Sequence, residues 1–199
     1  MARLVPLVLA IGMLFPSAAQ AGRMDIDVHD DFFAPDVVGN QVGDTVRWFS
    51  DGTNSNNHNV REDGLLFRNG DPTSAAFTYD VVFSAGTFHY YCEVHGSEFG
   101  GMDGLVRIPV RLNRAPDGLP FTVRWASAAS ETGSVYDVQF RVGSGDWRNW
   151  RTDTTTLSGV FGRNRNPVRV RDGVLYSFRA RSQEGTADSR YSPVRSFRP

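Results

Sequence analysis

The sequence predicts an all-β protein built from two sandwich domains. Apolar and polar residues alternate with the period of two of a β-strand in several short segments, and clusters of Gly, Pro, Asn and Asp separate these segments. The apolar spacing of an amphipathic helix is weak throughout. A chain of 199 residues is long enough for two domains, each of about 90 residues and each with a core of its own.

The first 21 residues have the composition of a secretory signal peptide. Arg3 precedes the apolar run 4–15, and Ala19-Gln20-Ala21 has the small residues of a cleavage site. The run is shorter than the roughly 20 apolar residues that span a bilayer. We therefore expect residues 1–21 to be removed, and the mature protein to be exported, periplasmic or extracellular, with no integral membrane segment.

The first domain is expected over residues 22–112. Its strands are predicted at residues 24–28, 45–49, 76–83, 87–92 and 105–112. Gly43-Asp44 is a turn before the second of these strands, and Ser84-Ala85-Gly86 joins the third to the fourth as a hairpin. Short strands at such regular intervals are typical of a β-sandwich.

A second domain is expected over residues 118–199. The turn-forming residues of the segment 113–118 mark a boundary, and we assign residues 113–117 to a linker. Beyond it, alternating apolar residues predict further strands, the last of them near 194–197. These residues are Phe121, Val123 and Trp125, then Tyr136, Val138 and Phe140, and then Tyr176, Phe178 and Ala180. They predict a second β-sandwich.

Metal-ligating side chains are concentrated in the first domain. Cys92 and His95 lie at the end of the strand 87–92, Met102 follows after a glycine-rich loop, and His58 is available after the strand 45–49. A thiolate, two imidazoles and a weak thioether are the ligand set of a type 1 (blue) copper centre. The single cysteine of an exported chain is buried and inert, intermolecular, or a ligand, and copper ligation explains its presence.

Other metal sites and functions fit the sequence less well. Structural zinc usually has four strong ligands, and a methionine is unsuited to the fourth position. A binuclear copper centre needs a second cysteine, and a multicopper oxidase needs several His-x-His pairs, all of which the sequence lacks. No nucleophile triad, phosphate-binding loop or nucleic-acid motif stands out. We expect one copper ion, no enzymatic activity and no nucleic-acid partner.

The remaining histidines are interpreted as solvated and not as ligands. His29 lies in an acidic run with Asp30 and Asp31. His89 alternates with Phe88 and Tyr90, so its ring points to the face of the strand opposite Cys92.

Charge is distributed unevenly, although the net charge is −1. Residues 22–112 contain six arginines and fourteen acids, whereas residues 113–199 contain fourteen arginines and eight acids. The acidic half would attract a basic redox partner. Arg179 and Arg181 alternate with apolar residues and predict a solvated basic face, by which the second domain could bind an anionic surface, a polysaccharide or a protein.

Trp147 and Trp150 either complete a core, the commoner role, or form a binding platform.

Residues 24–110 resemble the plastocyanin-like cupredoxins. The matching motifs, in order, are Phe33-Ala34-Pro35, Gly43-Asp44-Thr45-Val46-Arg47-Trp48, His58-Asn59-Val60 and Gly86-Thr87-Phe88-His89-Tyr90-Tyr91-Cys92. The resemblance implies a Greek-key β-sandwich with His58, Cys92 and His95 as equatorial ligands and Met102 as the axial ligand. Glu98 and a carbonyl of the loop are the alternatives for the axial position.

The same resemblance implies roles for residues next to the ligands. The backbone N–H of Asn59 would donate a hydrogen bond to the Cys92 sulfur. A route for electrons would run through Tyr91. A further route is expected from the sequence itself, through the exposed edge of His95, because the glycine-rich loop 96–101 beside it lets a partner approach closely.

Residues 116–199 resemble a fibronectin type III module, which is an immunoglobulin-like sandwich. Trp125 matches its buried tryptophan, the segment 170–176 resembles the stretch that ends in its tyrosine corner, and the segment 189–193 resembles its last-strand motif. The resemblance implies a domain that docks or spaces the first one.

Two functions are compatible with these features. The first is an exported one-electron carrier with a type 1 copper centre. The alternative is a non-redox, extracytoplasmic copper-binding or delivery protein whose second domain is an adhesion module. A complete Cys/His/His/Met set favours the electron carrier, because sites that deliver copper often use Met and His clusters, which the mature sequence lacks.

Overall fold

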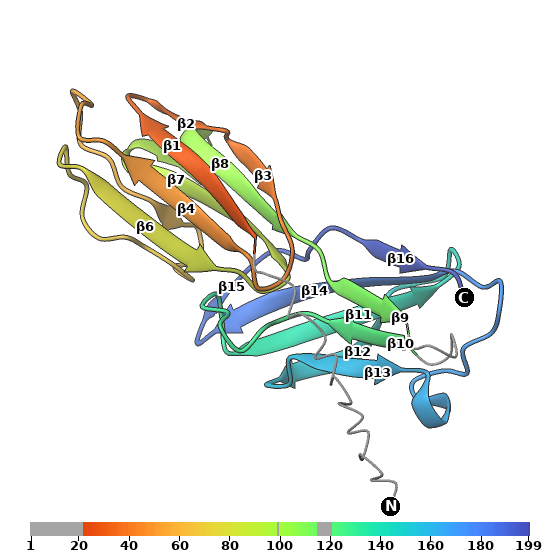
Figure 1. Ribbon diagram of the computed structural model, residues 1–199. Coiled ribbons are helices and arrows are strands. Elements are labelled where there is room, and N and C mark those ends of the chain that lie inside the picture. The colour runs from red at the N-terminus through yellow and green to blue at the C-terminus, as the bar shows by residue number, and fades with distance from the viewer. Residues whose placement is uncertain (1–21, 99, 115–120) are drawn as a thin grey trace, which may run out of the picture.

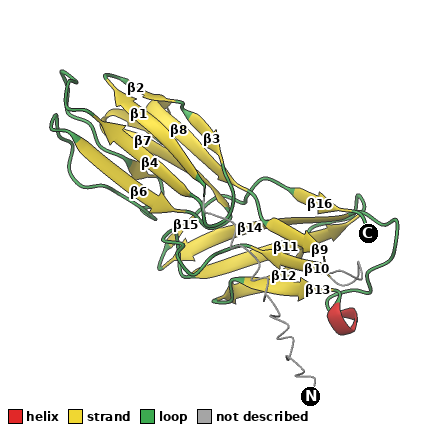
Figure 2. Cartoon of the chain, viewed as in Figure 1, coloured by secondary structure: helices red, strands yellow, loops and turns green. Residues whose placement is uncertain are grey.

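The computed structural model describes residues 22–98, 100–114 and 121–199, and it confirms the prediction of an all-β protein (Figure 1, Figure 2). The helical structure within these ranges is one 3₁₀ turn, η1 (Arg163–Arg165). The predicted signal peptide, residues 1–21, lies outside the described residues, as do residues 115–117 of the predicted linker.

Strands β1–β8 form what we call the first module, which contains two four-stranded sheets. One sheet has the order β2 (Phe32–Ala34), β1 (Arg23–His29), β4 (Thr45–Ser50), β6 (Phe77–Val82). The other has the order β3 (Val37–Gly39), β8 (Gly100–Ile108), β7 (Gly86–Ser97), β5 (Arg61–Glu62). The pairs β1–β4 and β3–β8 are parallel, and the other pairs are antiparallel.

The two sheets of the first module pack face to face around aromatic side chains. Trp48 of β4 is fully buried, and its ring centroid lies 5.1 Å from that of Tyr90 on β7. Phe33 of β2 contacts the same tyrosine edge-on at 5.0 Å. Each such apolar side chain contributes roughly 1.5–3 kcal/mol by burial. This packing holds β7, which carries the predicted ligands, rigidly between its neighbours.

Strands β9–β16 form the second module. A three-stranded sheet has the order β13 (Ser158–Phe161), β10 (Phe121–Arg124), β9 (Arg111–Arg114). A five-stranded sheet contains β12 (Arg148–Thr154), β11 (Val135–Val142), β14 (Tyr176–Glu184) and β15 (Ala187–Asp188) in this order, with β16 (Arg195–Phe197) also paired to β14.

The sheets of the second module also face one another. Phe121 of β10 packs on Phe178 of β14 with ring centroids 5.6 Å apart. Trp125 is fully buried, and Trp150 packs on it at 5.8 Å, which is the core role predicted for this tryptophan. The hydroxyl of Tyr176 accepts a hydrogen bond of 2.9 Å from the backbone N–H of Arg171, the contact that a tyrosine corner makes.

The single strand expected over residues 105–112 is divided between the two modules. β8 ends at Ile108, and β9 begins at Arg111 and pairs with β10 in the second module. Pro109 lies between them and has no N–H to donate to a sheet ladder. Residues 111 and 112, which we assigned to the first domain, therefore lie in a sheet of the second module.

The two modules are joined by hydrogen bonds between buried groups. The hydroxyl of Ser84 lies 2.7 Å from that of Thr132 and 2.6 Å from that of Ser182, and all three residues are fully buried. The Ala85 N–H donates to the carbonyl of Trp125 at 2.7 Å.

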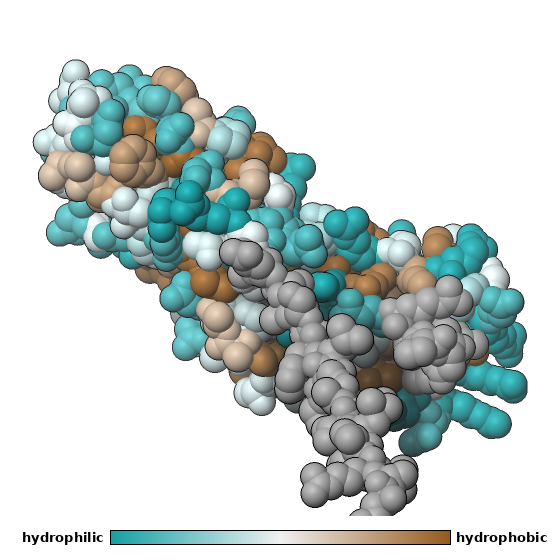
Figure 3. Space-filling model, viewed as in Figure 1, coloured by the Kyte–Doolittle hydropathy of each residue, from teal (hydrophilic) through white to brown (hydrophobic). Residues whose placement is uncertain are grey.

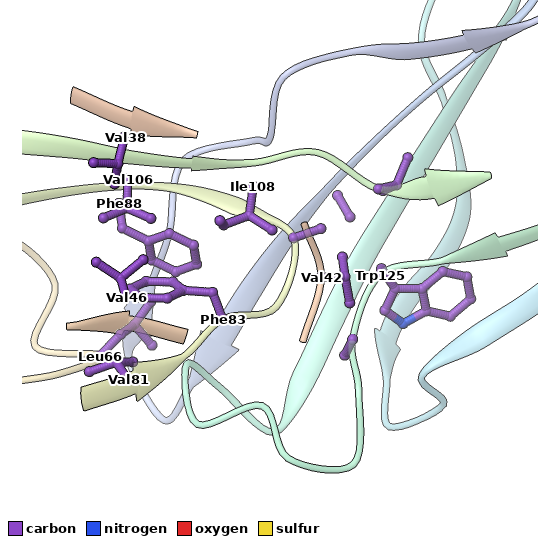
Figure 4. Packing of buried hydrophobic residues seen from close by; sticks show 14 of the residues in the cluster. Val38, Val42, Val46, Leu66, Val81, Phe83, Phe88, Val106, Ile108 and Trp125 are labelled. Carbon is purple, nitrogen blue, oxygen red and sulfur yellow. The ribbon is translucent and has the colours of Figure 1, made fainter. Parts of the chain in front are cut away.

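Apolar packing is also continuous across this junction. Core residues of the first module continue past Ile108 and Val42 to Trp125 of the second module (Figure 4). The junction is therefore a packed interior and not a flexible hinge.

Within the described ranges, no helix has the length and apolar character needed to cross a membrane. In the view of Figure 3, hydrophobic side chains are interspersed with hydrophilic ones on both modules.

Candidate metal centre

The fold brings three of the predicted ligands together. His58, Cys92 and His95 each offer one ligand atom, and these atoms lie within 4.8 Å of one another. The Cys92 Sγ is 3.8 Å from the Nδ1 of His58 and 3.6 Å from the Nδ1 of His95. His58 and Cys92 are fully buried, whereas the side chain of His95 is 20% exposed. The site is therefore a buried donor cluster with one ring edge at the surface.

A bulge in β7 positions Cys92 and His95. In the ladder between β7 and β8, Tyr91 pairs with Asp103, and the next regular pair is Gly96 with Gly101. Residues 92–95 thus stand opposite the single residue Met102, so the backbone folds inward and aims both side chains at one point. A Cβ at Gly96 would collide with the carbonyl oxygen of Met102, which explains the need for glycine at this position.

Met102 lies directly across from this bulge and is 1% exposed. Its role as the axial ligand stays a prediction. Of the alternatives, Glu98 is exposed at the surface. A backbone oxygen near the site comes instead from the loop before His58: the carbonyl of Asn57 is 3.9 Å from Cys92 Sγ.

Asp30 holds the ring of His58 in place, a contact that the sequence alone does not predict. The Oδ1 of Asp30 is 3.0 Å from the Nε2 of His58. The same carboxylate accepts hydrogen bonds from the backbone N–H groups of Ser55 at 2.9 Å and Asn56 at 3.1 Å. The Ser55 N–H and the His58 ring lower the pKa of Asp30 to about 2. An ionised Asp30 favours the His58 tautomer that carries its proton on Nε2, which leaves the Nδ1 lone pair for a metal.

Asp31 lies on the other side of the cluster. Its Oδ1 is 3.9 Å from the Nε2 of His95, which is within ion-pair range but too long for a hydrogen bond. The acidic run beside His29 thus supplies a carboxylate beside each of the two histidines of the cluster.

Asn59 has a different role from the one predicted. Within the described part of the chain, its backbone N–H makes no hydrogen bond to Cys92. Its side-chain Oδ1 instead accepts a hydrogen bond of 2.9 Å from the N–H of Glu93, and its Nδ2 donates to the carboxylate of Glu93 at 2.5 Å. Arg68 binds that carboxylate at 2.8 Å. Asn59 therefore fastens the His58 loop to the residue that follows Cys92.

The interpretation of His89 as solvated is wrong. The residue is 8% exposed, with Nδ1 at 2.7 Å from Asp63 Oδ1 and Nε2 at 2.7 Å from Asp103 Oδ2. Burial opposes protonation of the ring, but the Asp103 and Asp63 carboxylates outweigh it and raise the pKa of His89. The ring lies outside the ligand cluster, as expected. His29 is exposed and stacks on Phe32 with a centroid distance of 4.7 Å.

The predicted basic face formed by Arg179 and Arg181 is not simply solvated. The Arg179 guanidinium lies between the rings of Trp147 and Tyr191, 4.3 and 4.4 Å from their centroids. Arg181 pairs with Asp137 at 2.8 Å and with Asp188 at 2.5 Å. Stacking and ion pairing therefore occupy these cations within the module.

No protein-family model matches the sequence, and no curated protein matches it. Among solved structures, the chain is similar to a purple cupredoxin from Nitrosopumilus maritimus, with 27% identity over 42% of this chain and 97% of that one and a TM-score of 0.35. It is also similar to the Cu(I) form of a methionine-to-alanine mutant of amicyanin, with 25% identity over 46% of this chain and 84% of that one and a TM-score of 0.36. A reduced tryptophan-to-tyrosine mutant of amicyanin is 22% identical over 46% of this chain and 86% of that one, with a TM-score of 0.36. Each match covers less than half of this chain.

Proposed function

We propose that this protein is an exported one-electron carrier with a single type 1 copper centre held by His58, Cys92 and His95, with Met102 as the axial ligand. The observation that carries the proposal is the convergence of one thiol sulfur and two imidazole Nδ1 atoms at a buried point. Export, to the periplasm or the cell exterior, is part of the proposal and rests on the composition of residues 1–21.

The separations of the donor atoms fit one small metal ion. Bonds of about 2.0–2.3 Å that meet at angles near those of a trigonal site put a sulfur and a nitrogen ligand roughly 3.6–3.8 Å apart. The two sulfur–nitrogen separations are 3.6 and 3.8 Å. Two imidazoles and one thiolate favour copper over structural zinc, which needs a fourth strong ligand. Copper bound there would supply one-electron chemistry between its Cu(I) and Cu(II) states.

The protein's own residues keep the ligand geometry fixed. Asp30 orients the ring of His58, and Asn59 ties the His58 loop to the backbone beside Cys92. The bulge of β7 sets the position of Cys92 relative to His95. Because these contacts fix the His58 loop and the backbone around Cys92, little of the protein needs to rearrange when the charge of the centre changes.

The partly exposed ring of His95 is the proposed route for electrons to and from a partner. It is the ligand with a solvent-exposed edge, and Val94 beside it is 55% exposed. The acidic residues of the first module, Asp31 among them, favour a basic redox protein as the partner. Such charge acts mainly on the rate of association, so this rate should fall as salt is added.

The second module is proposed to be a fibronectin type III-like domain that docks or spaces the copper module. Its two facing sheets and the hydrogen bond from Arg171 to the Tyr176 hydroxyl support this. No group of the second module belongs to the cluster formed by the described ligand atoms.

The copper-loaded protein tests the proposal directly. We expect intense visible absorption in the oxidised state, a Cu(II) electron paramagnetic resonance signal, and a reversible one-electron wave in protein-film voltammetry. Cys92→Ser should abolish the visible band, whereas His89→Ala, which changes a histidine on the opposite face of β7, should keep it. Copper binding without a reversible wave would instead support a copper-delivery protein. Loss of the band in His89→Ala, with the band retained in His58→Ala, would refute the ligand assignment.

A further inference from the structure

A groove runs along the junction of the two modules, away from the metal centre. It consists of two adjoining hollows of about 520 and 490 Å³, which share Gln41, Pro109 and Arg195 in their walls. One hollow extends toward β3 and β8 of the first module, and the other extends along β9 and β16 of the second. The groove therefore depends on the way the two modules are packed together. Figure 1 shows the strands of both modules that contribute to it, β3, β8, β9 and β16.

Of the residues that the structure describes, three cations and no acid line the groove. Arg107 of β8, Arg111 of β9 and Arg195 of β16 lie in its walls, and neither hollow includes an Asp or Glu. Among the described residues, no side chain pairs with any of these three arginines. Other arginines of the protein do pair with a carboxylate, as Arg47 does with Asp80 at 2.6 Å. Three uncompensated guanidinium groups in one groove create a local positive potential, although the first module is acidic overall.

The remaining lining offers amide donors and saturated apolar faces. The Nδ2 of Asn40, in the wall of the first hollow, is buried and has no hydrogen-bond partner in the described part of the chain. A buried donor without an acceptor costs roughly 1–3 kcal/mol, so rotation of this amide toward an oxygen of a ligand in the hollow would be stabilising. Pro109 is buried in the floor, and Val194 is 45% exposed at the rim.

We infer that this groove binds an extended acidic polysaccharide that bears carboxylate or sulfate groups. Guanidinium groups bind both anions through paired hydrogen bonds, and cations spread over two hollows suit a chain of anionic groups better than a single ion. The side chains of Asn40, Gln41 and Asn113 suit sugar hydroxyls. Single-stranded nucleic acid is disfavoured because its binding sites use aromatic platforms for base stacking, and Phe197, which is half-buried, is the one aromatic residue among the described residues of the lining.

The groove and the metal centre are physically separate. Both touch β8, but Arg107 lies about 17 Å along the strand from Met102 at the usual rise per residue. A bound glycan would leave the exposed edge of His95 accessible, so the electron carrier could be held on an acidic matrix while it exchanges electrons. Binding in the groove does not depend on copper, so this inference and the proposed function can fail independently.

The test uses the full mature chain and isothermal titration calorimetry. The probes are size-defined sulfated and polyuronate oligosaccharides at two salt concentrations, with neutral dextran, single-stranded DNA and vesicles containing anionic lipid as alternatives. The groove variant combines Arg107→Gln, Arg111→Gln and Arg195→Gln. The control variant combines Arg124→Gln, Arg163→Gln and Arg165→Gln, which removes the same charge from exposed arginines that do not line the groove.

We expect the wild type and the control variant to bind the acidic oligosaccharides with similar affinity and not to bind dextran. The groove variant should bind roughly tenfold or more weakly. The slope of its log affinity against log salt concentration should be smaller by about two to three, because fewer counterions are released on binding. Asn40→Asp, which adds an anion to the wall, should also weaken binding. Absence of binding by the wild type, equal loss in both triple variants, or tighter binding to DNA or vesicles than to the oligosaccharides would overturn the inference.

Discussion

At the scale of single residues, Asp30 and His58 connect distant parts of the chain at the metal centre. They are 28 positions apart in the sequence, yet the Asp30 carboxylate bonds both the His58 ring and the backbone that leads to it. A carboxylate behind a ligating histidine fixes the tautomer of the ring and makes it a better donor. Asp30 is therefore a positioning residue for the proposed centre.

Asp30→Ala should weaken copper binding by roughly 10- to 100-fold, the usual cost of losing such a partner. Competition with a chelator of known affinity measures the change. Asp31→Ala is the matched control, because its carboxylate is 3.9 Å from His95 and makes no hydrogen bond to that ring. Equal effects of the two substitutions would mean that negative charge near the centre, and not the hydrogen bond between His58 and Asp30, strengthens copper binding.

Met102→Leu should leave copper bound and raise the reduction potential, because a weak donor that favours Cu(II) is removed from the axial position. Voltammetry of the two proteins measures the shift. Met24→Leu makes the same chemical change on β1 and should leave the potential unaltered. An unchanged potential in Met102→Leu would assign the axial position to another group, such as the carbonyl of Asn57.

At the scale of elements, the short strand β5 contains a buried acid. Glu62 is 2% exposed, and its carboxyl group accepts hydrogen bonds from the N–H groups of Gly64 at 2.7 Å and Leu66 at 3.1 Å. Burial raises the pKa of Glu62 to about 7, and the two N–H donors only partly oppose it. In the folded protein, the carboxyl group of Glu62 is therefore protonated at mildly acidic pH.

This pKa predicts a stability that falls as pH rises. Between about pH 4.5 and 7 the folded protein keeps a proton that the unfolded chain has lost, so the free energy of unfolding decreases with pH and levels off above 7. Across this range, the raised pKa of Glu62 lowers the free energy of unfolding by an amount on the order of 3 kcal/mol.

Glu62→Gln tests this contribution of Glu62 to the pH dependence of stability, because glutamine keeps an oxygen acceptor and cannot ionise. Denaturant unfolding of both proteins at pH 5 and pH 8 should show the variant gaining stability relative to the wild type as pH rises. A constant difference between the two proteins would mean that the pKa of Glu62 is not raised.

At the scale of the whole molecule, the two modules share one packed interior. Buried hydroxyl groups of Ser84, Thr132 and Ser182 bond across the junction, and the N–H of Ala85 depends on the carbonyl of Trp125. Removing the second module would leave these groups unpaired or exposed. The modules therefore contribute to each other's stability, although the described metal ligands all come from the first.

A chain that ends after Val110 tests this coupling, since it stops before β9 enters the second module. We expect the visible spectrum and reduction potential to be retained and the melting temperature to fall. Each kcal/mol lost should lower it by about 4–8 °C in a domain of this size. An unchanged melting temperature would mean that the modules are independent, and loss of copper by a folded truncated chain would mean that the second module supports the site.

The sequence by itself determined the features that depend on local pattern. Alternation predicted strands around Trp48, Phe88 and Phe178, because side chains of period two must lie on one face of a strand. The short spacing between Cys92 and His95 predicted that these two ligands approach each other, since few residues separate them. The structure then brought His58 to the same point.

Only the tertiary structure decided which distant groups stand opposite one another. Alternation says that His89 turns away from Cys92, but it does not say that Asp63 and Asp103 lie on either side of its ring. The pairing of Asp30 with His58 depends in the same way on how strands and loops are packed. The arginine groove arises where β8, β9 and β16 meet. Partners of this kind are set by register and by the packing of modules, which are cooperative properties of the whole chain and leave no signal in a short segment.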